Sequence, residues 1–185
     1  DPCKKEMHFQ NRGLLLPHFS ICSSYGKMIA ILVSLLISLV STSVNTMRLW
    51  PNNPNGTVTI PYFFDNYTIP IGDARRKTFQ LAVEVYRMST CIEWVEVARN
   101  ETTGHLKILD NKKGCSSHIG MRSNGTNRIS LLRSCNSLGT MIHEMGHVLG
   151  MYHTHQRPDR DDHVEIWKDN IKKGHRYNFR IERYA

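Results

Sequence analysis

Apolar residues recur along the chain with two different periods, which predict a mixture of strands and helices. Residues 57–64 carry β-branched and aromatic side chains and are expected to form a strand, in which Pro61 indicates a sheet edge or a bulge. Apolar residues spaced three and four apart follow Asp73, so residues 74–89 are predicted to form an amphipathic helix with Asp73 as its N-cap. Further strands are expected at residues 91–97, 105–109, 115–119 and 128–132.

This order of elements predicts the fold class and the domain organisation. Several strands combined with two long helices favour an α+β domain, with a twisted mixed sheet covered by helices. A chain of 185 residues, 40% of them hydrophobic, can bury one domain core. The Pro- and Asn-rich residues 48–56 are expected to form an extended entry loop. The sequence therefore divides into an N-terminal segment, residues 1–47, and a packed domain, residues 48–185.

The one long apolar run covers residues 28–40. It is shorter than the roughly 17–25 residues that a bilayer-spanning helix needs, and Lys27 precedes it while small residues follow, as in a signal peptide. We therefore expect a secreted, extracellular protein with no stable membrane span. A membrane anchor, which the length disfavours, and a buried core helix are the alternatives. Asn-x-Ser/Thr sequons, the glycosylation candidates of an exported chain, occur at Asn55, Asn66, Asn100 and Asn124.

The net charge of +8 would permit binding to nucleic acids or to anionic membranes. However, Lys and Arg occur singly or in short groups such as Lys112-Lys113, with carboxylates between them. Neither a basic block nor a pattern of stacking aromatic residues is present. We therefore expect no nucleic-acid partner, and we interpret the charge as a solvated surface.

The strongest chemical signal is His-Glu-Met-Gly-His at residues 143–147, followed by Gly150 and His153. Residues four apart on a helix share one face, so His143 and His147 can bind one metal ion. Gly150 can adopt a backbone conformation closed to other residues, which brings the chain round to His153 as a third ligand. Three neutral imidazoles leave the fourth coordination position open, which is the pattern of a catalytic zinc site.

These residues predict a secreted zinc-dependent endopeptidase with one Zn²⁺ per chain. Zinc lowers the pKa of bound water to about 7, and Glu144 would act as the general base that transfers its proton to the leaving amine. Motifs for a nucleophilic serine or a phosphate-binding loop are absent from the sequence. His155 is the nearest competitor of His153 for the third position, and histidines scattered on a polar helix are the alternative without a metal.

The motif and its continuation to Asp162 resemble the astacin family of zinc metallopeptidases, metzincins whose signature reads H-E-x-x-H-x-x-G-x-x-H-E-x-x-R-x-D-R-D. The resemblance extends from about Arg48 to the end of the chain. Residues 48–51 and 60–62 look like the opening of the family's domain. The cysteines that fall where the family has cysteines are Cys91, Cys115 and Cys135.

The resemblance implies the upper lobe of a metzincin, with residues 115–119 as the exposed edge strand above the cleft. Such an edge would bind a protein or peptide substrate in extended form through main-chain hydrogen bonds. Cys115 and Cys135 match a family disulfide and are therefore expected to be bonded to each other.

The sequence also departs from the family pattern. Thr154 replaces the family glutamate that pairs with the processed amino terminus, and no Met-His-Tyr follows Met151. In the family the cysteine at the position of Cys91 pairs with one near the end of the domain, and no cysteine follows Cys135, so Cys91 is expected to be left without a partner. The missing Met-His-Tyr and the missing cysteine predict a C-terminally incomplete domain with its lower lobe largely missing. The alternative function is therefore a catalytically weak or inactive peptidase fragment that retains zinc binding.

Overall fold

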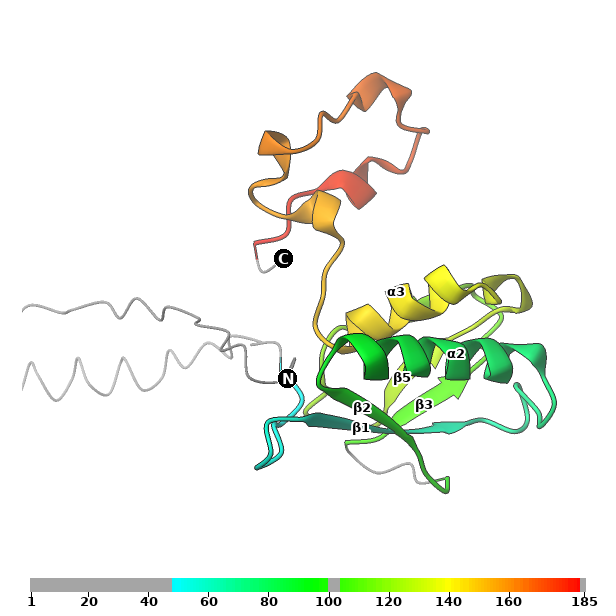
Figure 1. Ribbon diagram of the computed structural model, residues 1–185. Helices are drawn as coiled ribbons and strands as arrows, with labels where there is room; N and C mark the ends of the chain where they lie inside the picture. The colour runs from blue at the N-terminus through cyan, green and yellow to red at the C-terminus, as the bar shows by residue number, and fades with distance from the viewer. Residues whose placement is uncertain (1–47, 100–103, 184–185) are drawn as a thin grey trace, which may run out of the picture. The chain divides into compact units, whose positions relative to one another are not determined.

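A computed structural model describes residues 48–99 and 104–183, which contain one five-stranded sheet. Its strands are β1 (Val58–Phe64), β2 (Ile92–Glu96), β3 (Leu106–Leu109), β4 (Ser116–Ser117) and β5 (Asn127–Ser130), in the order β2-β1-β3-β5-β4 (Figure 1). β1, β2, β3 and β5 run parallel to one another, whereas β4 pairs antiparallel with β5 at the edge of the sheet. The sheet is therefore mixed, as the sequence predicts.

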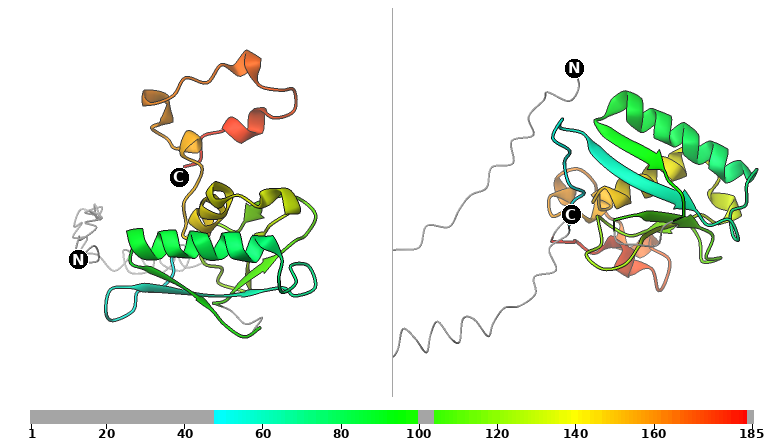
Figure 2. Two further views of the ribbon diagram at one scale, coloured as in Figure 1. Left: turned by 45° about the vertical axis from the view of Figure 1, so that its right-hand side comes forward. Right: turned by 90° about the horizontal axis from the view of Figure 1, so that it is seen from below.

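The two helices α2 (Ala74–Ser89) and α3 (Leu138–Val148) lie on one face of this sheet and pack against each other (Figures 1 and 2). Asp73 caps α2 by accepting a hydrogen bond from the backbone N–H of Arg75, as predicted. Ser137 caps α3 by accepting one from the N–H of Thr140. The α+β class is thus confirmed.

The core lies between the sheet and the two helices. Alternate residues of β1 face the helices, and Tyr62 and Phe64 contact Phe79 of α2 with ring centroids 5.1 and 5.6 Å apart. Such aromatic pairs contribute about 0.5–1.5 kcal/mol each beyond their buried area. The indole Nε1–H of Trp50 donates to the backbone oxygen of Val148 at 2.8 Å, so the entry segment is tied to the end of α3.

The expectation that Pro61 marks a sheet edge or a bulge is wrong. Pro61 lies in β1, which is an interior strand between β2 and β3. The backbone oxygen of Tyr62 accepts a hydrogen bond from the N–H of Val97, on the side of β2. Because the backbone groups of successive strand residues point to opposite sides, the nitrogen of Pro61 points toward β3. Pairing with β3 begins only at Tyr62 with Leu106. Pro61 lacks an N–H, but it lies just before the first hydrogen-bonded pair between β1 and β3, so no hydrogen bond of the sheet is lost.

Cys115 and Cys135, the pair for which the resemblance implies a disulfide, are bonded with an S–S distance of 2.07 Å and a Cα–Cα distance of 5.8 Å. The bond joins the start of β4 to the 3₁₀ turn η2 (Arg133–Cys135) that leads into α3. Cys91 is disulfide-bonded as well, so the expectation that it lacks a partner is wrong.

After α3, regular structure in the described residues consists of 3₁₀ turns. They are η3 (Thr154–Gln156), η4 (Arg160–Asp162), η5 (Lys168–Asn170) and η6 (Arg176–Phe179). In this region the guanidinium of Arg160 donates to the backbone oxygens of His155 and Phe179 and so links three of the turns. In the ranges that the structure describes, no helix has both the length and the apolar character of a membrane span. The signal-peptide-like run at 28–40 and the sequon at Asn100 lie outside those ranges.

Candidate metal centre

Helix α3 places His143 and His147 one turn apart, as the spacing of the motif predicts. The helix ends at Val148, and Gly150 just beyond it has a φ of +104°, in the left-handed region that favours glycine. Two hydrogen bonds close the turn: the N–H of Gly150 donates to the oxygen of His147 at 2.8 Å, and the N–H of Met151 donates to that of Gly146 at 3.1 Å. The chain then returns, so that His153 faces the helix.

The three histidines converge through their Nε2 atoms. His147 Nε2 lies 3.1 Å from His143 Nε2 and 3.2 Å from His153 Nε2. One ligand atom from each of the three residues lies within 4.8 Å of the others. His147 is buried, whereas His143 and His153 are exposed. The structure therefore brings together all three residues that the sequence indicates as ligands, in a group open to solvent on one side.

Hydrogen bonds to the other ring nitrogens fix the tautomers of two of these histidines. His147 Nδ1–H donates to the backbone oxygen of Met151 at 2.6 Å, and His153 Nδ1–H donates to Oε1 of Gln156 at 3.0 Å. Both acceptors lack a hydrogen, so each neutral ring carries its hydrogen on Nδ1. The unprotonated Nε2 atoms of His147 and His153 thus lie 3.2 Å apart, so their lone pairs repel each other. A cation between them would remove this repulsion.

The donor set and its spacing fit zinc. Zinc–nitrogen bonds of about 2.0–2.1 Å in a tetrahedron place neighbouring ligand nitrogens roughly 3.3–3.4 Å apart, close to the separations of 3.1 and 3.2 Å found here. Burial lowers the pKa of His143, the neighbouring His147 lowers it further, and Glu144 opposes the shift. This ring is therefore neutral near pH 7, which is the form that binds a metal.

His155 does not join the group, although it follows closely in sequence. Its Nε2–H donates to the backbone oxygen of Asn178 at 2.9 Å, and its ring stacks on that of His153 with centroids 5.4 Å apart. His155 is thus a neighbour of the third histidine and not a competitor for its position.

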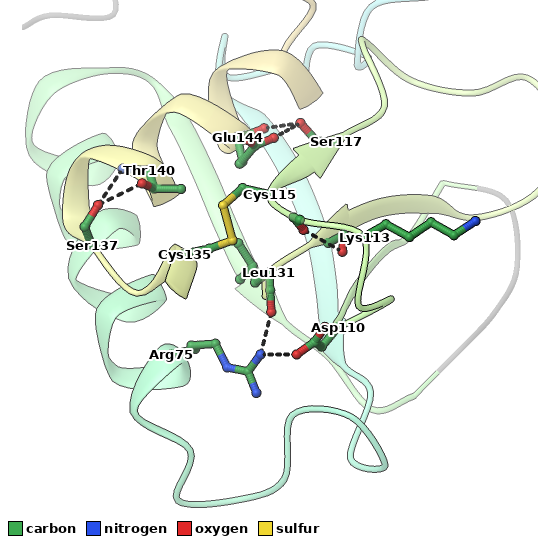
Figure 3. The surroundings of a disulfide bond; sticks show 12 residues. Arg75, Asp110, Lys113, Cys115, Ser117, Leu131, Cys135, Ser137, Thr140 and Glu144 are labelled. Carbon is green, nitrogen blue, oxygen red and sulfur yellow. Dashed lines mark hydrogen bonds and ion pairs between the residues drawn. A yellow bond between two sulfur atoms is a disulfide. The ribbon is translucent and has the colours of Figure 1, made fainter. Parts of the chain in front are cut away.

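Glu144 lies on α3 directly after His143, and only 4% of it is exposed. The hydroxyl of Ser117, on the edge strand β4, lies 2.7 Å from Oε2 of Glu144 and can donate to it (Figure 3). No motif in the amino-acid sequence marks Ser117 as part of the site. Its contact with Glu144 depends on how β4 packs against α3, and no local spacing in the sequence reports that packing.

A cavity of about 330 Å³ adjoins the histidines on the side of α2. Tyr86 of α2 contributes to it, and its hydroxyl donates to the backbone oxygen of Ile142 at 3.1 Å. Met151 and Thr154 line it from the segment after α3. The histidine group therefore adjoins a hollow with both apolar and polar walls, as binding sites commonly do.

Comparison with known proteins places this site in a family. The family model described as Astacin, a peptidase family, matches residues 43–184, most of the chain. The chain belongs to the astacin family. The match covers the sheet, both helices and the histidine group, and it confirms the resemblance inferred from the motif that ends at Asp162.

Curated relatives and a solved structure agree with membership of the astacin family. Tolloid-like protein 1 of Homo sapiens is 36% identical over 135 residues, which cover 72% of this chain and 12% of that protein. Zinc metalloproteinase nas-25 of Caenorhabditis elegans is 35% identical over 132 residues, 71% of this chain and 31% of that protein. The chain thus spans a minor part of the length of these relatives.

The solved structure of High choriolytic enzyme 1, a hatching enzyme zinc-protease from Oryzias latipes, superimposes with a TM-score of 0.64 at 28% identity. The superposition covers 74% of this chain and 66% of that one. The mixed sheet with its two helices is therefore the astacin-type fold.

Proposed function

We propose that this chain carries the zinc-binding site of a secreted metalloendopeptidase, with one Zn²⁺ held by His143, His147 and His153. The observation that carries the proposal is the convergence of three Nε2 atoms beside the buried Glu144. Membership of a peptidase family supports it, and so do the names of a zinc metalloproteinase and a zinc-protease among the similar proteins.

A zinc ion bound there would supply Lewis acidity, which polarises a carbonyl and lowers the pKa of water toward about 7. The chain's own acid–base group is Glu144. Its carboxylate would accept a proton as the oxygen of water attacks the scissile carbonyl carbon, and would then pass that proton to the amide nitrogen as the C–N bond breaks. The base ends in its starting state, and no covalent bond to the enzyme is formed.

The substrate would be an extended protein or peptide segment that pairs with β4. The sheet order ends at β4, so within the described residues one side of this strand carries no neighbouring strand. Ser117 of β4 contacts the backbone oxygen of Glu144 at 2.9 Å, so a peptide along this strand would pass close to the proposed base. Binding through main-chain groups would accept many side-chain sequences.

Secretion is proposed from the leader-like residues 28–40 and from the sequons. The described sequon residues Asn55, Asn66 and Asn124 are all exposed, as glycan attachment requires. We accordingly propose residues 1–47 as an N-terminal segment and residues 48–185 as the peptidase domain, a division close to the start of the family match at residue 43.

Separating the roles of two neighbouring residues tests the function. Glu144→Ala should keep about one zinc per chain and lose roughly 10²–10⁴-fold in peptide cleavage, whereas His147→Ala should lose the metal itself. Elemental analysis and a fluorogenic peptide assay on the full chain measure the two properties. His175→Ala, at an exposed histidine outside the group, is the matched control and should behave as wild type. Near-normal turnover by Glu144→Ala would show that the base is assigned wrongly.

The alternative is a chain that binds zinc but cleaves peptides slowly or not at all. Exposure of His143 and His153 favours it, because a site open to water holds substrate poorly in a reactive geometry. The same assays distinguish the two functions. One zinc per chain, combined with wild-type cleavage no faster than that of Glu144→Ala, would establish the alternative.

A further inference from the structure

The edge strand β4 and the loop after it are attached to helix α3 at three points. The Cys115–Cys135 disulfide joins the start of β4 to the turn before the helix (Figure 3). At the helix end, the N–H of Gly120 donates to the backbone oxygen of His147 at 2.9 Å. Between these two points lies the contact of Ser117 with Glu144. The strand proposed to bind substrate and the helix that carries the histidines are therefore held together along the whole motif.

The central contact differs from the other two because it reaches a side chain with proposed chemistry. Ser117 Oγ lies 2.7 Å from Glu144 Oε2 and 2.9 Å from the backbone oxygen of the same residue. Glu144 is 4% exposed, so water cannot readily replace a lost donor. A charge-assisted hydrogen bond to one carboxylate oxygen restricts rotation of the carboxylate and leaves its second oxygen to accept a proton.

We propose that Ser117 is a positioning residue that holds the Glu144 carboxylate in the orientation needed for proton transfer. The inference rests on the proposed peptidase function. Ser117 belongs to the strand along which the substrate would lie, so one residue connects the place of substrate binding with the orientation of the base. A purely structural role predicts a different result, in which loss of the hydroxyl lowers stability but leaves the turnover of the folded enzyme unchanged.

Substitution of Ser117 tests the positioning role in the zinc-loaded full chain. Ser117→Ala should lower kcat about 10- to 100-fold with little change in KM, as expected when a partner that orients an active-site group is removed. Its zinc content should remain about one per chain. Ser117→Thr restores the hydroxyl and should recover most of kcat. Ser123→Ala, at an exposed serine in a turn, is the matched control and should leave kcat unchanged.

A second measurement does not depend on activity. In the metal-free protein, the shifts in unfolding temperature of Ser117→Ala, Glu144→Gln and the double variant should be non-additive, because both single changes remove the same hydrogen bond. Additive shifts would overturn the contact. A kcat of Ser117→Ala equal to that of an active wild type would overturn the positioning role. If wild type does not cleave peptides, the proposed function fails and the positioning role falls with it, while non-additive shifts would still establish the contact.

Discussion

Two arginines of helix α2 form ion pairs of the same length, one in a buried cluster of partners and the other at the surface. Arg75 Nη2 lies 2.7 Å from Asp73 Oδ2, and Arg87 Nη2 lies 2.7 Å from Glu84 Oε2. The side chain of Arg75 is 3% exposed and that of Arg87 is 65% exposed. We predict that Arg75→Met lowers the free energy of unfolding by about 3–5 kcal/mol, whereas Arg87→Met lowers it by at most about 1 kcal/mol.

The larger value follows from what the buried guanidinium contacts. Arg75 also pairs with Asp110 at 2.8 Å and donates to the backbone oxygen of Leu131 at 2.5 Å (Figure 3). Its removal leaves two carboxylates at most 16% exposed without their cation, and a buried carbonyl without its donor. In contrast, Arg87→Met removes only an ion pair at the surface, where solvent screens the attraction.

Urea unfolding of the full chain, followed by circular dichroism at a fixed metal concentration, measures both values. Arg75→Lys keeps the charge but loses the planar fork, and it should fall between wild type and Arg75→Met. If Arg75→Met lowered the free energy of unfolding no more than Arg87→Met does, the reasoning would be refuted, because the buried partners that Arg75 leaves behind would then have no measurable cost.

Three further predictions concern stability. Replacing Cys115 and Cys135 together by Ala should lower the free energy of unfolding by about 3 kcal/mol, the chain-entropy value for a separation of 20 residues; an unchanged urea midpoint would contradict it. The hydrogen bond from Arg75 lowers the pKa of Asp73 to about 2. The contribution of this carboxylate to the free energy of unfolding should therefore be complete above about pH 4 and lost as pH falls through about 2. An Asp73→Asn variant with the same acid unfolding profile as wild type would contradict this. Burial raises the pKa of Tyr62 to about 12, with a smaller effect from Glu96. The free energy of unfolding should therefore fall as pH rises from about 10 to 12, and Tyr62→Phe should abolish this part of the alkaline loss of stability.

The parts of the fold and site that the sequence predicts well depend on short-range geometry. Helix α2 begins where its N-cap indicates, and the histidine group forms because a helical turn and the Gly150 turn together fix its ligands. Long-range packing accounts for the rest. The strand expected at 115–119 shortens to Ser116–Ser117, and farther on the N–H of Met121 donates to Arg48, a partner distant in sequence. Likewise, only the tertiary structure brings Ser117 to Glu144 and buries Arg75.

The hydrogen bond between Trp50 and the carbonyl of Val148 has a consequence for synthesis of the chain. The two residues are 98 positions apart in sequence. At roughly 5–20 residues per second, a ribosome needs about 5–20 s to reach the second partner after the first. During that interval the indole, 7% exposed in the folded protein, has no native acceptor for its N–H, so the nascent chain presents an unburied aromatic residue to chaperones and to neighbouring chains.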